Sequence, residues 1–145
     1  MIHLHPPLTA FPLALISVAT LLEIWCMIRP SSACRAAIRI NLILAAVFVV
    51  AAFFSGYWAS DSANQTFIVS DETIRQHHNA GRLLLFLIFP CAALEFLSAH
   101  ATHNPKLFRA LYLIALVVCF GLVVYTGLLG GRLVFLEGAG VSATR

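Results

Sequence analysis

The chain has 145 residues, of which 61% are hydrophobic and 10% are charged, and its mean hydropathy is +0.92. Because soluble domains carry about 25% charged residues, this composition excludes an ordinary soluble domain and predicts one integral membrane domain over residues 1–145. The formal charge is +3, and without a phosphate-binding loop, GxSxG or HExxH the sequence gives nucleotide, nucleic-acid and hydrolytic chemistry no support.

Four apolar segments are each long enough, at about 20 residues, to cross a hydrocarbon core of about 30 Å as a helix. The predicted fold class is an all-α integral membrane protein, a four-transmembrane-helix bundle. Its helices are expected at about residues 8–28, 40–59, 71–98 and 108–135. Pro6 and Pro7 suit the first turn of the first helix, whereas Pro12 and Pro90 fall inside helices and should bend them.

The third helix has a defined start and two distinct faces. Ser70 is a good capping residue, and Asp71 and Glu72 follow it in the positive first turn. Helical spacing places one set of side chains on a face that should turn inward: His77, Gly81, Ile88 and Glu95. A second set forms a line expected at the surface or in the headgroup layer: Arg75, His78 and Arg82.

The positions of the basic residues predict the orientation of the chain. Five of them fall in or beside the first and third connections: Arg29, Arg35, Arg39, Lys106 and Arg109. None precedes the first helix, and the second connection also carries acids: Asp61, Asp71 and Glu72. By the positive-inside rule, the first and third connections face the cytoplasm, so both termini should be periplasmic.

The sequence contains a weak internal repeat. His5 and His77 each open an apolar run with a carboxylate 18 residues later, at Glu23 and Glu95. Further matches lie at offsets of 70 and 71 residues: Arg39 with Arg109, and Ser55-Gly56 with Thr126-Gly127. Two tandem hairpins related by a pseudo-twofold axis along the membrane normal would explain these matches. The two histidines would then share one depth near the periplasmic side, with both carboxylates about 27 Å below them.

The repeated histidines predict a cofactor site. Haem iron accepts histidines from facing helices, and bundle cores are a usual place for such sites. His5 and His77 are therefore candidate axial ligands of a b-type haem, with His78 as an alternative to His77. Arg82 and Arg132 would lie at the same membrane face, where they could pair with the haem propionates. The alternative is that both histidines are interfacial residues that cap helix ends and bind no cofactor.

The two glutamates are predicted to lie within the membrane, near its cytoplasmic side. Carboxylates are costly there and often functional. Glu23 and Glu95 either pair with each other and share a proton, or they form structural ion pairs with Arg39 and Arg109 across the bundle. The sequence leaves both alternatives open.

Other small and polar residues have simpler interpretations. The four cysteines have neither CxxC nor CxxCH spacing, which excludes covalent c-type haem, and they are expected to behave as small hydrophobes. Gly127 and Gly131 form a GxxxG motif, which allows close approach of membrane helices. His100 and His103 lie in a basic connection and are expected to be solvated.

Several motifs together resemble a known family. A His-Pro pair precedes a Phe-Pro pair in the first helix, a histidine opens the third, and the last helix ends in a glycine-rich motif: His5-Pro6, Phe11-Pro12, His77, Thr126-Gly127, Gly130-Gly131-Arg132-Leu133-Val134-Phe135 and Gly138-Ala139-Gly140-Val141. Over nearly the whole chain this pattern is similar to a bacterial four-helix family of predicted membrane proteins of unknown function. The resemblance implies an inner-membrane location, a redox context and a likeness to small b-type cytochromes. Histidines expected from the family pattern are replaced here by Ala10, Leu128 and Glu137.

These features predict a small inner-membrane subunit of an electron-transfer system of the respiratory or photosynthetic type. It would bind haem b, or border a quinone, near the periplasmic face of the lipid bilayer, beside other subunits of a redox complex. An electron-transfer or accessory subunit is expected rather than a stand-alone enzyme. The alternative class is a cofactor-free structural subunit that packs against a larger membrane complex.

Overall fold

The computed structural model describes residues 5–66 and 70–139, and for residues 60–66 it describes the backbone alone. Four helices make up this part of the chain: α1 (His5–Ile28), α2 (Ser32–Thr66), α3 (Asp71–His100) and α4 (Pro105–Phe135). Each is long and apolar enough to cross a membrane, and the described residues form no strand. The predicted fold class, an all-α bundle of four transmembrane helices, is confirmed. The predicted Gly140-Val141 ending and the Asp61 side chain lie outside the described residues.

The helices extend beyond the apolar segments that predicted them. The second helix begins at Ser32 rather than near residue 40, because the Ser31 hydroxyl accepts the Cys34 N–H at 3.1 Å and starts the helix early. Hydropathy marks where a helix crosses lipid and not where its hydrogen bonds begin. Ser70 is the N-cap of α3 as predicted, but its hydroxyl makes no capping bond. Both internal prolines, Pro12 and Pro90, lie within continuous helices.

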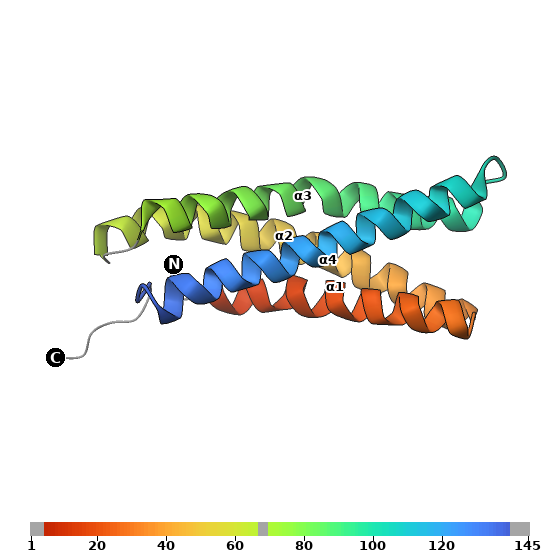
Figure 1. Ribbon diagram of the computed structural model, residues 1–145, viewed down its shortest axis with the longest axis horizontal. Helices are drawn as coiled ribbons and strands as arrows, with labels where there is room; N and C mark the ends of the chain where they lie inside the picture. Colours follow the sequence, from red (N-terminus) through yellow and green to blue (C-terminus); the bar gives the residue numbers. More distant parts are fainter. Residues whose placement is uncertain (1–4, 67–69, 140–145) are drawn as a thin grey trace.

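The helices pack in a ring, in which each contacts its neighbours in the sequence and α1 contacts α4. The diagonal pairs, α1 with α3 and α2 with α4, are not in backbone contact over the described residues. The start of α1, the start of α3 and the end of α4 lie at one end of the bundle (Figure 1). We call this the histidine end, after His5 and His77, and we call the opposite end the arginine end, after Arg35, Arg39 and Arg109.

Branched and small side chains fill the core, and large apolar side chains cover the outside. Ile16, Ile38 and Ile88 are completely buried, and the four cysteines, which form no disulfide, are buried around them. Exposed large side chains occur along every helix, with Leu21, Phe86 and Leu128 each about two-thirds exposed. Because soluble monomers rarely expose so much apolar surface, this exterior requires lipid.

Candidate functional site

An apolar cavity of about 600 Å³ lies at the histidine end, and all four helices contribute to its wall. Sites for cofactors and small molecules have volumes of this order, with mostly apolar walls and a few well-placed polar groups. The polar side chains of this wall are two threonines and three histidines: Thr9, Thr126, His5, His77 and His78. Small residues on the surrounding helices leave the space open, among them Ala52, Gly56, Gly81 and Gly127.

His5 and His77 meet inside the bundle although their helices are diagonal to each other. Their ring centroids are 5.9 Å apart, and their ring planes are inclined by 89°. Both side chains are half-buried and both line the cavity. The structure therefore brings together the two residues that the sequence predicts as axial ligands.

Both imidazole rings are held through Nδ1. The Thr126 carbonyl oxygen can only accept, so His77 Nδ1 donates to it, at 3.1 Å. His5 Nδ1 lies 2.9 Å from Ser55 Oγ, and the Ser55 hydroxyl already donates to the Ala52 carbonyl oxygen at 2.9 Å. The His5 ring must then donate as well. In the neutral form of each ring, this hydrogen-bond network places the proton on Nδ1 and leaves the metal-binding lone pair on Nε2.

Two glycines lie against these rings. A Cβ at Gly56 would be 2.6 Å from Cε1 of His5, and a Cβ at Gly130 would be 3.3 Å from Cε1 of His77. Because glycine has no Cβ, each of these positions leaves space for the neighbouring imidazole ring. The predicted GxxxG pair, Gly127 and Gly131, also lines the cavity but contacts neither ring. The sequence repeat pairs Gly56 with Gly127 and so does not indicate that Gly130 supports His77.

His78 lies on the cavity wall and not on the surface line predicted with Arg75 and Arg82. Its ring stacks on both Phe53 and Tyr57 of α2, with ring centroids 6.2 Å apart in each pair. These contacts with α2 turn the side chain inward, which helical spacing within α3 alone does not predict. Its Nε2 atom is buried and has no hydrogen-bond partner within the described residues.

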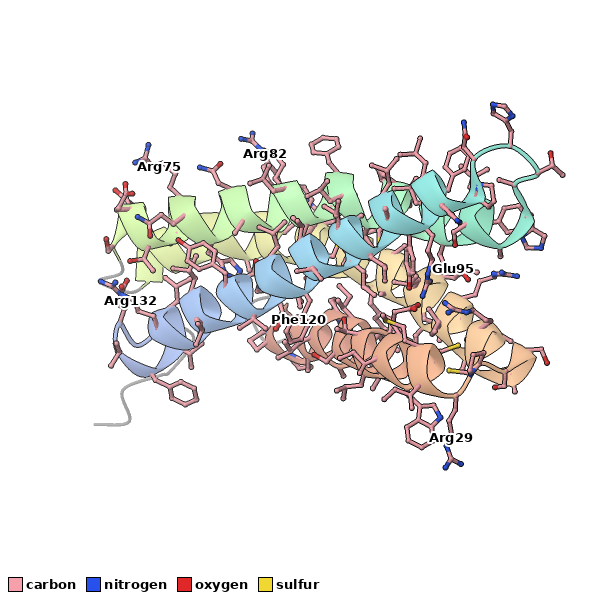
Figure 2. The ribbon with its side chains drawn as sticks, turned by 45° about the vertical axis from the view of Figure 1, so that its right-hand side comes forward. Arg29, Arg75, Arg82, Glu95, Phe120 and Arg132 are labelled. Carbon is pink, nitrogen blue, oxygen red and sulfur yellow. The ribbon has the colours of Figure 1, made fainter. Side chains whose placement is uncertain are left out.

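Of the two arginines predicted beside the cofactor, only Arg132 lies at the rim of the cavity. Its chain neighbours Gly131 and Leu133 line the cavity. Arg82 is exposed, donates to Asn79 Oδ1 at 3.2 Å and points away from the bundle (Figure 2). The structure does not bring Arg82 to the histidines.

Glu137 connects the end of α4 to the start of α3 beside the cavity. Its Oε1 accepts the Thr73 hydroxyl at 2.8 Å and Arg132 Nε at 3.2 Å, and its Oε2 accepts the Ser70 backbone N–H at 2.9 Å. These bonds, with the Ser70 N–H first, hold the pKa of the Glu137 carboxyl below its ordinary value. We call this set of bonds the Glu137 clasp.

At the arginine end, arginines neutralise both buried glutamates. Glu23 is paired with Arg109 and with Arg35, the latter at 2.8 Å, and it accepts the Tyr112 hydroxyl at 3.0 Å. Glu95 is labelled between the helices in Figure 2. Of the two alternatives from the sequence, the structure shows ion pairs. Nothing in the sequence repeat indicated that Arg35 and Tyr112 also bind Glu23.

Corresponding positions of the two hairpins contact the histidines and the glutamates, although Ser55 uses its hydroxyl and Thr126 its backbone carbonyl. In each hairpin the second helix holds the histidine of the first: Ser55 holds His5, and Thr126 holds His77. At the arginine end, each hairpin supplies an arginine to the other's glutamate: Arg39 to Glu95 at 2.9 Å, and Arg109 to Glu23. This exchange supports the predicted pseudo-twofold relation between the hairpins.

A known protein family matches nearly the whole chain. The family described as predicted membrane protein (DUF2231) matches residues 1–143, which include all four helices and the residues of both ends. No curated protein and no solved structure matches the chain significantly. The chain therefore belongs to the DUF2231 family of predicted membrane proteins.

Proposed function

We propose that this protein is a small electron-transfer subunit of the bacterial inner membrane that binds haem b between His5 and His77. One observation carries the proposal. Two histidines from diagonal helices converge on one apolar cavity, and in the neutral form of each ring the hydrogen bond at Nδ1 leaves Nε2 free to bind a metal. Histidines that only capped helix ends would need neither the convergence nor the cavity.

The geometry brings the two rings close enough to take part in one site. Their centroids are 5.9 Å apart on the wall of the same cavity, so a single bound group could contact both rings. The apolar wall would surround a bound group, and three cavity glycines that contact neither ring leave it room: Gly81, Gly127 and Gly131.

The residues of this chain have separate parts in the proposed site. Bound haem would supply one-electron redox chemistry. Ser55 and the Thr126 carbonyl fix the tautomer and orientation of the two ligands. Arg132 lies at the rim, where a cation would meet a propionate, and it replaces the predicted pair of Arg82 and Arg132. The apolar wall keeps water away from the ligands.

A lipophilic quinone is the second candidate for the same cavity. Leu13, Gly127 and Phe135 line the cavity and are themselves exposed, so the cavity reaches the outer surface between α1 and α4. In a membrane this opening faces lipid, from which a quinone ring could enter toward the histidines. A cofactor-free accessory subunit of a larger redox complex is the outcome if neither ligand binds.

The absorption spectrum of the purified protein tests the haem proposal. Expression with a haem supply should give a Soret band that is weakened and shifted in His5→Ala and in His77→Ala and is lost when both histidines are replaced. His100→Ala is the matched control, because His100 is exposed at the other end of α3 and, among the described residues, hydrogen-bonds Phe96 of its own helix. A colourless protein that retains quinone favours the second candidate, and a colourless protein without quinone favours the accessory role.

The proposed orientation places both termini and the histidine end in the periplasm. Its support is the charge distribution, since the five basic residues of the first and third connections lie toward the arginine end. Haem or quinone would then exchange electrons with partners at the periplasmic face.

A further inference from the structure

The surplus positive charge of the chain is concentrated at the arginine end. Five cations there face two carboxylates: Arg29, Arg35, Arg39, Lys106 and Arg109 against Glu23 and Glu95. The other four basic and four acidic residues of the sequence cancel, so the formal charge of +3 belongs to this end alone.

Two helix N-termini add to this positive field. α2 and α4 begin at the arginine end, and neither has an acidic residue in its first turn. Instead, Arg35 and Arg109 lie close to these helix starts. A helix N-terminus carries a partial positive charge and is stabilised by anions, so cations there are unfavourable without a counter-charge. The start of α3 has that counter-charge in Asp71 and Glu72.

One buried carboxylate serves both of these arginines. Arg35 and Arg109 bind opposite oxygens of Glu23, which is only 2% exposed, and their own side chains are 31% and 27% exposed. The cluster therefore keeps one positive charge more than its carboxylate neutralises. Each guanidinium has five N–H donors, and within the described residues each spends one of them on Glu23. Donors and charge remain for a second anion.

The surroundings indicate what kind of molecule carries that anion. Exposed apolar side chains lie at the same helix ends: Ile28, Ile40, Leu107 and Leu111. A ligand at this position meets guanidinium groups and apolar surface together, as a phospholipid does with its phosphate and its chains. We propose that the Arg35–Glu23–Arg109 cluster binds the phosphate of an anionic membrane phospholipid. This site is separate from the cavity and does not depend on the proposed haem.

Lipid retention by the purified protein tests this site. The protein is exchanged into detergent micelles that contain phosphatidylcholine and phosphatidylglycerol, and bound lipid is counted by native mass spectrometry. Arg35→Gln and Arg109→Gln should each lower phosphatidylglycerol affinity about tenfold, because each loses a hydrogen bond between charged groups. Glu23→Gln should raise retention, because it removes the competing carboxylate. A purely structural role of the cluster predicts no gain in Glu23→Gln.

Arg29→Gln is the matched control, since it removes one charge from the same end. Arg29 is exposed, lies 5.7 Å from the Trp25 ring and does not contact Glu23, so phosphatidylglycerol affinity should stay within about twofold of wild type. Equal losses in Arg29→Gln and Arg35→Gln would mean diffuse attraction and overturn the proposal. Displacement of the lipid by an equal concentration of inorganic phosphate would overturn the lipid assignment. If the glutamine variants lose helicity by circular dichroism, Arg35→Lys takes their place: it keeps the charge, loses the guanidinium fork and should weaken retention selectively.

Discussion

At the scale of single residues, the site depends on what holds the histidines rather than on the histidines alone. Ser55 and the Thr126 carbonyl fix the protonated nitrogen of each ring, and Gly56 and Gly130 leave space for the ring itself. The sequence predicted His5 and His77, because a histidine before an apolar run is conspicuous. It did not predict their supports, because a carbonyl oxygen has no sequence signature and a glycine has many uses.

Replacing a ring-supporting glycine with alanine should cost more stability where the added carbon would lie closer to the ring. Gly56→Ala forces a carbon to 2.6 Å from the His5 ring, so the ring must move, at a cost of about 1–3 kcal/mol. Gly130→Ala, at 3.3 Å from His77, should cost less. Thermal unfolding and the haem content per chain measure both effects.

Gly121→Ala is the control for these substitutions, because nothing lies within 4 Å of its added carbon. It should leave haem content unchanged and raise helix stability by about 0.5–1 kcal/mol. Equal behaviour of all three alanine variants would show that the histidine rings do not occupy these positions.

The Glu137 clasp should weaken in acid. Its hydrogen bonds lower the folded-state pKa of Glu137 below the ordinary 4.5, so the ionised form is favoured by folding. The stabilisation is fully present above pH 4.5 and is lost as the pH falls through the lower folded value. Relative to the intrinsic exchange rate at each pH, amides at the start of α3 should therefore lose protection below pH 4.5 in wild type, whereas Glu137→Gln should already be poorly protected at neutral pH. If the ratio of the wild-type exchange rate to the exchange rate of Glu137→Gln stayed constant across this pH range, the clasp would be refuted.

At the scale of helices, two hairpins are joined by exchanged ion pairs at one end and by converging histidines at the other. Arg39 of α2 reaches Glu95 of α3, and Arg109 of α4 reaches Glu23 of α1. Helix number and approximate position followed from hydropathy. The long α2 did not, because hydropathy ignores the polar helical turns that carry Arg35 and Arg39.

Removing one partner of an ion pair between the hairpins should make the hairpins easier to separate. Arg39→Gln leaves Glu95, which is 1% exposed, without its arginine. We expect a loss of about 3 kcal/mol, at the low end for buried pairs because Arg39 is one-third exposed. Unfolding in a denaturing detergent measures it. The double variant with Glu95→Gln should lose less than Arg39→Gln alone, and additive losses would argue against the pairing.

At the scale of the whole molecule, the class and the number of helices could be predicted from the sequence, and so could the correspondence of positions between the two repeats. The sequence did not determine the cavity, because a cavity depends on how four faces meet in space. His78 shows the difference: its position on α3 suggested the surface, but Phe53 and Tyr57 of α2 hold it on the cavity wall. The exchanged pairing of Glu23 and Glu95 was one of two alternatives until the helices were placed.

The orientation of the molecule can be tested with fused reporters. Alkaline phosphatase, which is active only in the periplasm, should be active when fused after Arg145 and inactive when fused at Thr102, in the connection between α3 and α4. The physical reason is the retention of basic connections on the cytoplasmic side. The reverse pattern of activity would place the histidine end in the cytoplasm and invert the proposed direction of electron exchange.

The central claim, one haem iron held by His5 and His77, is tested most directly by the spin state of the iron in the purified protein. Electron paramagnetic resonance of the oxidised protein should show low-spin iron with two axial nitrogens. His5→Gly should show high-spin iron, and added imidazole should restore the low-spin signal by filling the vacated position. A bound haem whose low-spin signal survives both His5→Gly and His77→Gly, or a protein that binds no haem when haem is supplied, would contradict the account.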